Sequence, residues 1–179
     1  MLKRRFMSSC RLLIASVFGL FVLSAAVPAF AVTPATITIT GGTLEISAPT
    51  ASVNLGTLVN TVGGGTVSGQ LGMVQVSDAR SAAAGSGWVA SAISSAFTPA
   101  TGTAIAASAV GYAAGPITKV GTAVYTANDP DDLTAVTPAV TASGITGDNS
   151  ATWNPTINVA VPGGTAAGVY SATITHSVL

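Results

Sequence analysis

Side chains that do catalytic chemistry are scarce in this chain. Beyond residue 31 there is no cysteine, one histidine (His176) and six carboxylates, of which only Asp131 and Asp132 are adjacent. A hydrolytic triad needs a base that an acid holds against a nucleophile, and a nucleotide site needs a glycine-rich phosphate loop. Neither pattern is present, and His176 alternates with apolar residues, as a core or rim residue does. The inventory predicts a protein that is not an enzyme and has no cofactor.

Oxygen ligands for a cation gather in one segment, residues 128–132, with Asp148 and Asn149 further along the chain. Carboxylate and amide oxygens are the ligands that calcium prefers. The spacing is not that of an EF-hand loop, and Asp-Pro-Asp is typical of turns. We therefore predict a turn in this segment and no metal site.

The two tryptophans, Trp88 and Trp153, are the largest side chains available for packing or for a ligand. Trp153 shares its side of an alternating run with Ile157 and Val159, so we predict that it packs in the core. Trp88 follows Gly-Ser-Gly at the expected start of a strand. Two interpretations stay open for it: core packing, or a part-exposed aromatic that contacts a ligand.

The elements that position these residues are β-strands, because apolar residues alternate with polar ones and no window shows helical periodicity. Residues 36–40 and 43–47 are two such runs around Gly41 and Gly42, which predicts a β-hairpin. Residues 151–161 form the clearest single strand, with Pro155 placing it at an edge or a bulge. In residues 169–179, one face carries Tyr170, Ala172, Ile174, His176 and Val178.

Further strands are expected near residues 53–55, 67–76, 88–93, 104–110 and 122–126, and residues 128–149 form the least predictable loop. Short strands at this spacing predict an all-β fold, a single antiparallel β-sandwich of the Ig-like or Greek-key type. The predicted structural core includes Trp153, Ile157, Val159, Tyr170 and Ile174.

The N-terminus has the three parts of a secretory signal peptide. Four of the six Lys and Arg residues lie in the first 11 positions, an apolar run spans residues 12–27, and Ala-Phe-Ala at 29–31 is a cleavage site. A retained membrane helix is the alternative, but the run of about 16 residues is shorter than the roughly 20 needed for a span. We predict a signal peptide at residues 1–31, a single domain at 32–179 and no membrane span in the mature chain.

The predicted mature domain has few charges. Two basic residues, Arg80 and Lys119, stand against six acidic ones, which gives a formal charge of −4. Nucleic-acid binding requires a basic face, so this composition argues against it. No anchoring motif follows the last strand, so we expect any retention at the cell surface to be non-covalent.

Two segments of the chain resemble the WxL domain of Gram-positive surface proteins. Residues 76–80 (Val-Ser-Asp-Ala-Arg), a small-residue turn and residues 87–91 (Gly-Trp-Val-Ala-Ser) resemble its proximal motif. Residues 161–163 (Val-Pro-Gly) and 167–176 resemble its distal half. The chain departs from the family at Ala90, where the family has Leu, and at residues 176–178, where His-Ser-Val replaces the second Trp-x-Leu.

The resemblance implies a secreted protein at the extracellular cell-wall surface that binds peptidoglycan or another wall polymer non-covalently, and possible complexes with other surface proteins. The residues it assigns to wall or partner binding are Trp88, Asp78, Arg80 and His176. Asp78 and Arg80 are two positions apart on one strand face, which also predicts a structural ion pair. The rival hypothesis is a structural subunit that builds a surface layer or fibre by adding a strand to a neighbour's sheet edge.

Overall fold

Strands make up almost all of the regular structure that the computed structural model describes, which covers residues 34–179. The predicted signal peptide lies outside these described residues. Residues 39–179 form one compact unit of antiparallel strands with one short 3-10 helix, η1 (Ala107–Ala109). Within the described part of the chain, no helix is long and apolar enough to cross a membrane. The predicted all-β antiparallel sandwich is confirmed.

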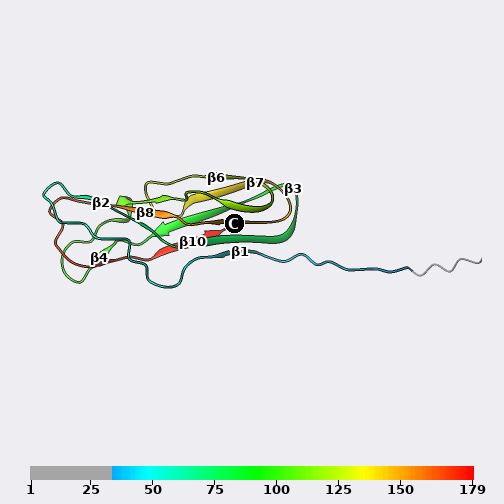
Figure 1. Ribbon diagram of the computed structural model, residues 1–179, viewed down its shortest axis with the longest axis horizontal. Coiled ribbons are helices and arrows are strands. Elements are labelled where there is room, and N and C mark those ends of the chain that lie inside the picture. Colours follow the sequence, from blue (N-terminus) through cyan, green and yellow to red (C-terminus); the bar gives the residue numbers. More distant parts are fainter. Residues whose placement is uncertain (1–33) are drawn as a thin grey trace, which may run out of the picture. The chain divides into compact units, whose positions relative to one another are not determined.

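The largest sheet has five strands, with the order β1-β3-β7-β6 and with β10 also paired to β3 (Figure 1). Its two longest strands, β3 and β7, pair along most of their length. The strands of this sheet are β1 (Leu44–Ser47), β3 (Val74–Ser94), β6 (Thr118–Ala127), β7 (Thr137–Trp153) and β10 (Ile174–Val178).

This sheet folds back on itself halfway along β3. A straight strand would separate residues 80 and 87 by roughly 23 Å, at about 3.3 Å per residue. Instead, the Nη2 atom of Arg80 lies 3.4 Å from the carbonyl oxygen of Gly87. The β3–β7 register shifts three times between Asp78 and Trp88. Positive φ angles accompany the fold at Ser81 (53°) and Gly85 (88°) on β3 and at Gly144 (63°) and Gly147 (72°) on β7. The two halves of one sheet therefore face each other.

A second sheet has three strands in the order β2-β8-β5. These strands are β2 (Gly65–Gln70), β8 (Thr156–Val161) and β5 (Val110–Ala113), and β4 (Thr98–Pro99) pairs separately with β9 (Tyr170–Ser171). Loop backbone packs against both outer strands of the second sheet. The backbone of Leu55 lies close over one face of β2 at Gly69, and at the outer edge of β5 the backbone N–H of Tyr112 donates to the carbonyl of Pro130 over 2.8 Å.

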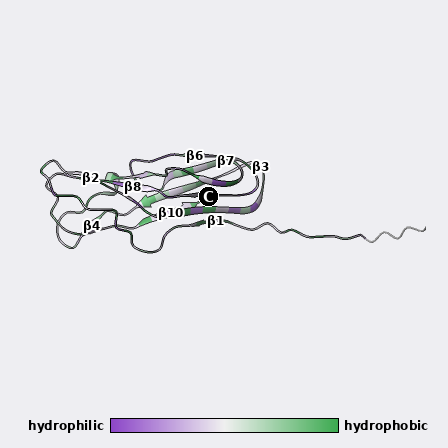
Figure 2. Ribbon diagram, viewed as in Figure 1, coloured by the Kyte–Doolittle hydropathy of each residue, from purple (hydrophilic) through white to green (hydrophobic). Residues whose placement is uncertain are grey.

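The core lies between these layers and consists of Val, Ile, Leu and Ala side chains with four aromatic residues among them. Trp153, Ile157 and Val159 are buried, as predicted. Tyr170 and Ile174 are half-buried and pack against the core from the last two strands. Apolar and polar positions alternate along the strands (Figure 2). The face with Tyr170, Ala172, Ile174, His176 and Val178 is the more buried one, as the alternation predicts.

Residues 151–161 do not form the single strand that their alternation predicts. β7 ends at Trp153 and β8 begins at Thr156, so the chain passes from one sheet to the other at Pro155. Proline lacks an N–H to donate, which ends the first ladder. The carbonyl of Pro155 still accepts from the N–H of Leu71 over 2.9 Å. The odd-numbered face from Ala151 to Val159 stays buried across the change of sheet.

The predicted hairpin around Gly41 and Gly42 is wrong. Only its second half is a strand, β1, whose partner is β3 rather than residues 36–40. Ile37 and Ile39 are 88% and 82% exposed. The Gly-Gly pair lies against β3 instead: a Cβ on Gly42 would approach the side chain of Ala79 to 2.8 Å. The glycines permit close approach of two backbones, not a tight turn.

Four other expected elements also need correction. Residues 53–55 form no strand, and residues 104–110 contain an isolated bridge at Ile105 and the 3-10 helix η1. Residues 128–149, expected as a loop, contain most of β7. The expected strand at 67–76 is interrupted at 71–73, whereas residues 88–93 and 122–126 lie within β3 and β6, as predicted.

Candidate binding site at the fold of the sheet

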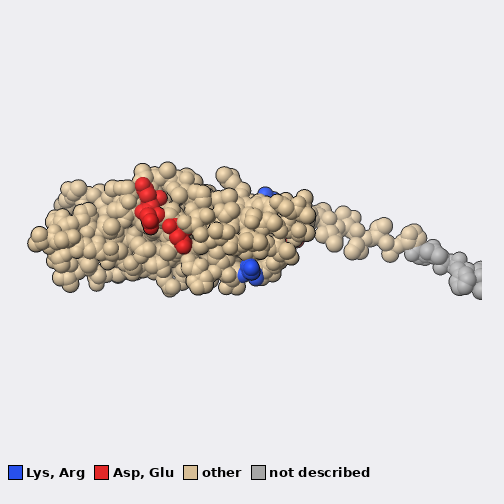
Figure 3. Space-filling model, turned by 90° about the horizontal axis from the view of Figure 1, so that it is seen from above, with Lys and Arg blue, Asp and Glu red and all other residues tan. Residues whose placement is uncertain are grey.

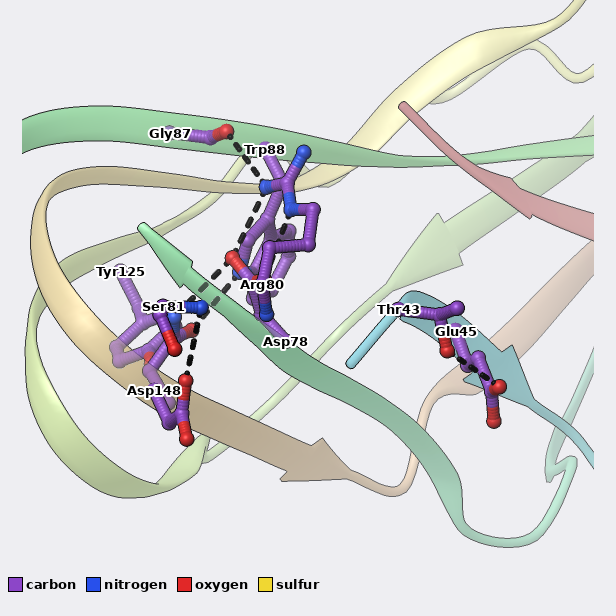
Figure 4. Close-up of polar contacts among 10 residues, drawn as sticks. Thr43, Glu45, Asp78, Arg80, Ser81, Gly87, Trp88, Tyr125 and Asp148 are labelled. Atoms are coloured by element: carbon purple, nitrogen blue, oxygen red, sulfur yellow. Dashed lines mark hydrogen bonds and ion pairs between the residues drawn. The ribbon is translucent and has the colours of Figure 1, made fainter. Parts of the chain in front are cut away.

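Three of the four residues predicted to bind wall or partner meet where the sheet folds back. Asp78, Arg80 and Trp88 lie within one set of contacts that also includes Tyr125 and Asn149 (Figure 4). We call these five residues the bend cluster. The fourth, His176, belongs to a separate group with Tyr112 and Trp153. The structure thus brings the proximal motif together and leaves His176 outside it.

The Asp78 carboxylate is the centre of the bend cluster. Its Oδ1 accepts from Nε of Arg80 at 2.8 Å, and its Oδ2 accepts from Nη2 of Arg80 at 2.9 Å. The backbone N–H of Arg80 and the Nδ2 of Asn149 each donate over 3.2 Å. The hydrogen bond from Arg80 holds the pKa of Asp78 below its ordinary value and raises the pKa of Arg80, although burial opposes both shifts. The predicted ion pair is present, and it is bidentate.

Asn149 connects the ion pair to the aromatic side chains. Its Oδ1 accepts from Nε1 of Trp88 at 3.0 Å, and the Tyr125 hydroxyl lies 3.2 Å from the same oxygen. The ring centroids of Trp88 and Tyr125 are 5.6 Å apart. Burial, and then the charge of Asp78, raises the pKa of the Tyr125 phenol. Asn149 therefore provides polar partners for two aromatic groups and for the carboxylate.

Trp88 is a core residue, so of the two interpretations left open for it the structure supports core packing and not a part-exposed aromatic at the start of a strand. It is 2% exposed and lies in the interior of the 21-residue strand β3. The Gly-Ser-Gly stretch before it does reverse the direction of the chain, but within the folded sheet and not at a free rim. Trp88 therefore supports the site without contacting a ligand in this conformation.

Arg80 is the member of the bend cluster through which the site reaches solvent. Its side chain is 39% exposed, whereas that of Asp78 is 0% exposed. Nε and Nη2 are occupied by Asp78 and by the Gly87 carbonyl. Nη1 makes no hydrogen bond with any residue of the described chain, and Figure 4 shows one guanidinium nitrogen free of dashed lines. The guanidinium is thus held in place while two N–H donors stay available.

His176 lies instead in the core network around Tyr112. Nε1 of Trp153 donates to the Tyr112 hydroxyl at 2.7 Å, and Nε2 of His176 is 3.2 Å from that hydroxyl. Nδ1 of His176 is buried and has no hydrogen-bond partner within residues 34–179. Burial lowers the pKa of His176 and raises that of Tyr112. The geometry makes His176 part of the packing between β10, β5 and β7.

The candidate calcium ligands Asp132 and Asp129 accept backbone hydrogen bonds, one within a turn and one from a distant segment. Oδ1 of Asp132 accepts from the backbone N–H of Thr134 at 2.7 Å, and Oδ1 of Asp129 accepts from the N–H of Ala114 at 2.8 Å. No group of three or more His, Cys, Asp or Glu side chains is arranged to hold a metal in the part of the chain that the structure describes.

Sequence reasoning missed Asn149 and Tyr125. The signal for Asn149 was present, because it continues the buried odd-numbered face of Ala151 and Trp153 by one step. A polar residue on a buried face requires polar partners. Tyr125 gave no comparable signal, since its contact with Trp88 depends on the fold of the sheet.

Comparison of the chain with protein-family models, curated proteins and solved structures finds no match.

Proposed function

We propose that this chain is an exported, non-catalytic domain of the bacterial cell surface that binds a wall polymer, or a partner surface protein, non-covalently. Export is supported by the basic head, apolar run and Ala-Phe-Ala site of residues 1–31. Wall binding is supported by the WxL resemblance of residues 76–80 and 87–91. These two short motifs share one hydrogen-bonded cluster, so they act as a single unit.

The observation that carries the proposal is the fixed and part-exposed guanidinium of Arg80. Its position is set by two bonds to Asp78 and one to Gly87, so little side-chain entropy is lost when a ligand binds. The two free N–H groups, both on Nη1, can donate to a carboxylate oxygen or to an amide carbonyl, and the cation adds charge attraction to a carboxylate. The peptide stems of peptidoglycan carry both groups, and we assign them as the ligand of Arg80.

The surroundings of Arg80 favour a specific contact over general electrostatic attraction. Arg80 and Lys119 are the only basic residues from position 34 onward. Figure 3 shows a few separate charged groups on a surface that is otherwise uncharged. A domain with so little positive charge gains little from long-range attraction to an anionic polymer. Affinity then depends on short-range hydrogen bonds and contacts near the bend cluster.

Co-sedimentation with purified cell walls tests this proposal. The exported protein is mixed with intact wall, with wall from which an amidase has removed the peptide stems, and with chitin as an unrelated glycan. We expect it to pellet with intact wall and to stay largely in the supernatant with the other two. Equal pelleting with stem-free wall would assign binding to the glycan, and no pelleting with any wall would refute wall binding.

A second candidate function, a structural subunit that assembles by strand addition, is favoured by one observation. Among the strands of residues 34–179, β6 is an edge strand that pairs with β7 alone. Its side chains Val120 and Val124 are 67% and 61% exposed. An exposed edge with so little charge is a template for pairing with another chain. Concentration-dependent self-association without any wall material would support this candidate.

A further inference from the structure

The outer edge of β6 differs from the outer edge of β5 in the second sheet. Loop backbone is hydrogen-bonded to β5, where the N–H of Tyr112 donates to the carbonyl of Pro130. No backbone hydrogen bond from outside the ladder reaches β6 within residues 34–179. Natural sheets protect such edges with charges, and β6 has a single one, Lys119, near its start. The other end of β6, residues 124–127, has no charge at all.

The same chain has a strand-like segment without a ladder partner. Residues 36–40 read Thr-Ile-Thr-Ile-Thr, and both isoleucines are more than four-fifths exposed. The β1–β3 register runs to Asp78, and backbone hydrogen bonds of Gly42 and Thr43 with Ala79, followed by the close approach of Gly41 to Arg80, continue it to the point where β3 folds away. Residues upstream of Gly41 therefore have no continuing strand of β3 to pair with.

We propose that residues 36–40 of one copy of this protein add as a strand to the 124–127 end of β6 in a second copy. The proposal rests on the second candidate function and names its donor and its acceptor. Both segments lack charge, and both expose β-branched side chains that favour sheets. Addition would bury Ile37 and Ile39 against a face that includes Val124, and would supply β6 with its missing hydrogen bonds.

The position on β6 follows from its shape. Gly121 has a positive φ of 86°, and the register of β6 with β7 shifts on both sides of Thr122. A straight donor strand cannot follow that irregular stretch. From Val124 to Ala127 the pairing with β7 is regular, and this length suits the five residues of the donor. Each copy has one donor and one acceptor, so successive additions give a head-to-tail chain of copies.

Analytical ultracentrifugation of the exported protein tests the inference. Replacing both isoleucines, as Ile37→Asp and Ile39→Asp, should weaken self-association by about tenfold or more, because charges at a pairing strand oppose edge addition. The matched control is Val59→Asp with Val62→Asp, two valines that are 83% and 97% exposed and lie outside strands. We expect the control to associate as the wild type does. A wild type that stays monomeric at all concentrations would overturn the inference.

Disulfide trapping shows which segments meet. Exported protein with Thr38→Cys is mixed with differently tagged exported protein with Thr126→Cys, and residues 32–179 contain no other cysteine. We expect a mixed dimer, and none when Val62→Cys replaces Thr38→Cys. A chain with both cysteines that closes on itself, while the mixture yields no dimer, would show intrachain addition and refute the proposal.

The possible results also distinguish strand addition by residues 36–40 from assembly in general and from wall binding. Association that survives the two Asp substitutions but is lost in Val124→Lys would keep assembly through β6 and reject residues 36–40 as its donor. Association that survives both sets of substitutions would place assembly elsewhere on the surface.

Pelleting with purified wall is expected to be equal for wild type and for the Ile37→Asp, Ile39→Asp variant, since Arg80 is unchanged. Loss of pelleting in that variant would make assembly a condition of wall binding.

Discussion

The two tryptophans stand in two contrasting polar environments within one small core. Trp88 donates to the amide of Asn149, which in turn donates to a buried carboxylate paired with Arg80. Trp153 donates to the hydroxyl of Tyr112, and that hydroxyl contacts the half-buried side chain of His176. The first environment is ionic and reaches solvent through Arg80. The second is neutral and closed.

We infer from this difference that both groups serve packing, whereas the bend cluster also serves ligand recognition. Both groups join strands that are far apart in sequence, since Trp88 and Asn149 are 61 positions apart and Tyr112 and Trp153 are 41 apart. Only the bend cluster presents a fixed donor to solvent. We therefore expect substitutions in either group to cost stability, whereas substitutions at Arg80 alone should also cost binding.

The largest effect is expected from removing either tryptophan. Trp88→Ala and Trp153→Ala should each lower the free energy of unfolding by about 3–5 kcal/mol, because both side chains are buried and each would leave a cavity. Urea unfolding measures the loss, with Val62→Ala as an exposed control. A Trp88→Ala variant with near wild-type stability would show that Trp88 is not part of the core.

Breaking the ion pair comes next. Arg80→Ala leaves the Asp78 carboxylate buried, and we expect a loss of about 2–3 kcal/mol, less than for a fully buried pair because water can replace the part-exposed Arg80. Asp78→Asn should cost less, because the buried charge goes with it. The ranking is checked by the same urea titrations. Equal losses of stability in Arg80→Ala and Asp78→Asn would mean that the unpaired charge of Asp78 is not the cause of the loss in Arg80→Ala.

A smaller loss is expected in the neutral network. Tyr112→Phe removes the acceptor of Trp153 Nε1, and a buried N–H without a partner costs about 1–3 kcal/mol. Thermal unfolding and the near-ultraviolet signal of the tryptophans both report the change. Wild-type stability in this variant would show that the Trp153 N–H finds another partner.

The smallest effect is on the pH dependence of stability, and it separates the two groups. Burial lowers the pKa of His176 from its ordinary 6.5, so the unfolded chain binds a proton first as the pH falls below that value. Stability should therefore decline below pH 6.5, by at most about 1.4 kcal/mol per pH unit for one proton. Urea unfolding from pH 7.5 to 5 measures the decline.

The carboxylate of Asp78 contributes in the same direction but at lower pH. Its folded-state pKa lies below the ordinary 3.8, so its stabilisation is present above that value and is lost as the pH falls further. His176→Gln should remove the decline near pH 6 and leave the one below pH 4, and Asp78→Asn should do the reverse. A decline near pH 6 that persists in His176→Gln would assign it to another group.

Local alternation predicted what depends on neighbours in sequence. The burial of Trp153, Ile157 and Val159 follows from their shared strand face, and it survives the change of sheet at Pro155. The pairing of Asp78 with Arg80 follows from their two-residue spacing on one strand. Each prediction required only that the backbone be extended, which the composition of these segments favours.

The errors arise where the sheet folds back. The burial of Trp88 depends on Tyr125 and Asn149, which reach it only because β3 and β7 fold together. The same fold interrupts alternation in residues 143–148, so β7 resembles a loop in sequence. The partner of β1 is β3, about 30 positions downstream. The Gly-Gly pair after residues 36–40 had instead predicted a local hairpin between neighbouring segments. No local pattern encodes these long-range pairings.

Measuring stability and wall binding on the same two variants tests the central claim most directly. Arg80→Lys keeps the charge but loses the planar fork, and Tyr112→Phe alters only the closed network. At a temperature where both remain folded, we predict that Arg80→Lys pellets much less with intact wall than wild type does, while Tyr112→Phe is less stable yet pellets equally. Undiminished pelleting of Arg80→Lys, or an equal loss in both variants, would contradict the assignment of binding to the bend cluster.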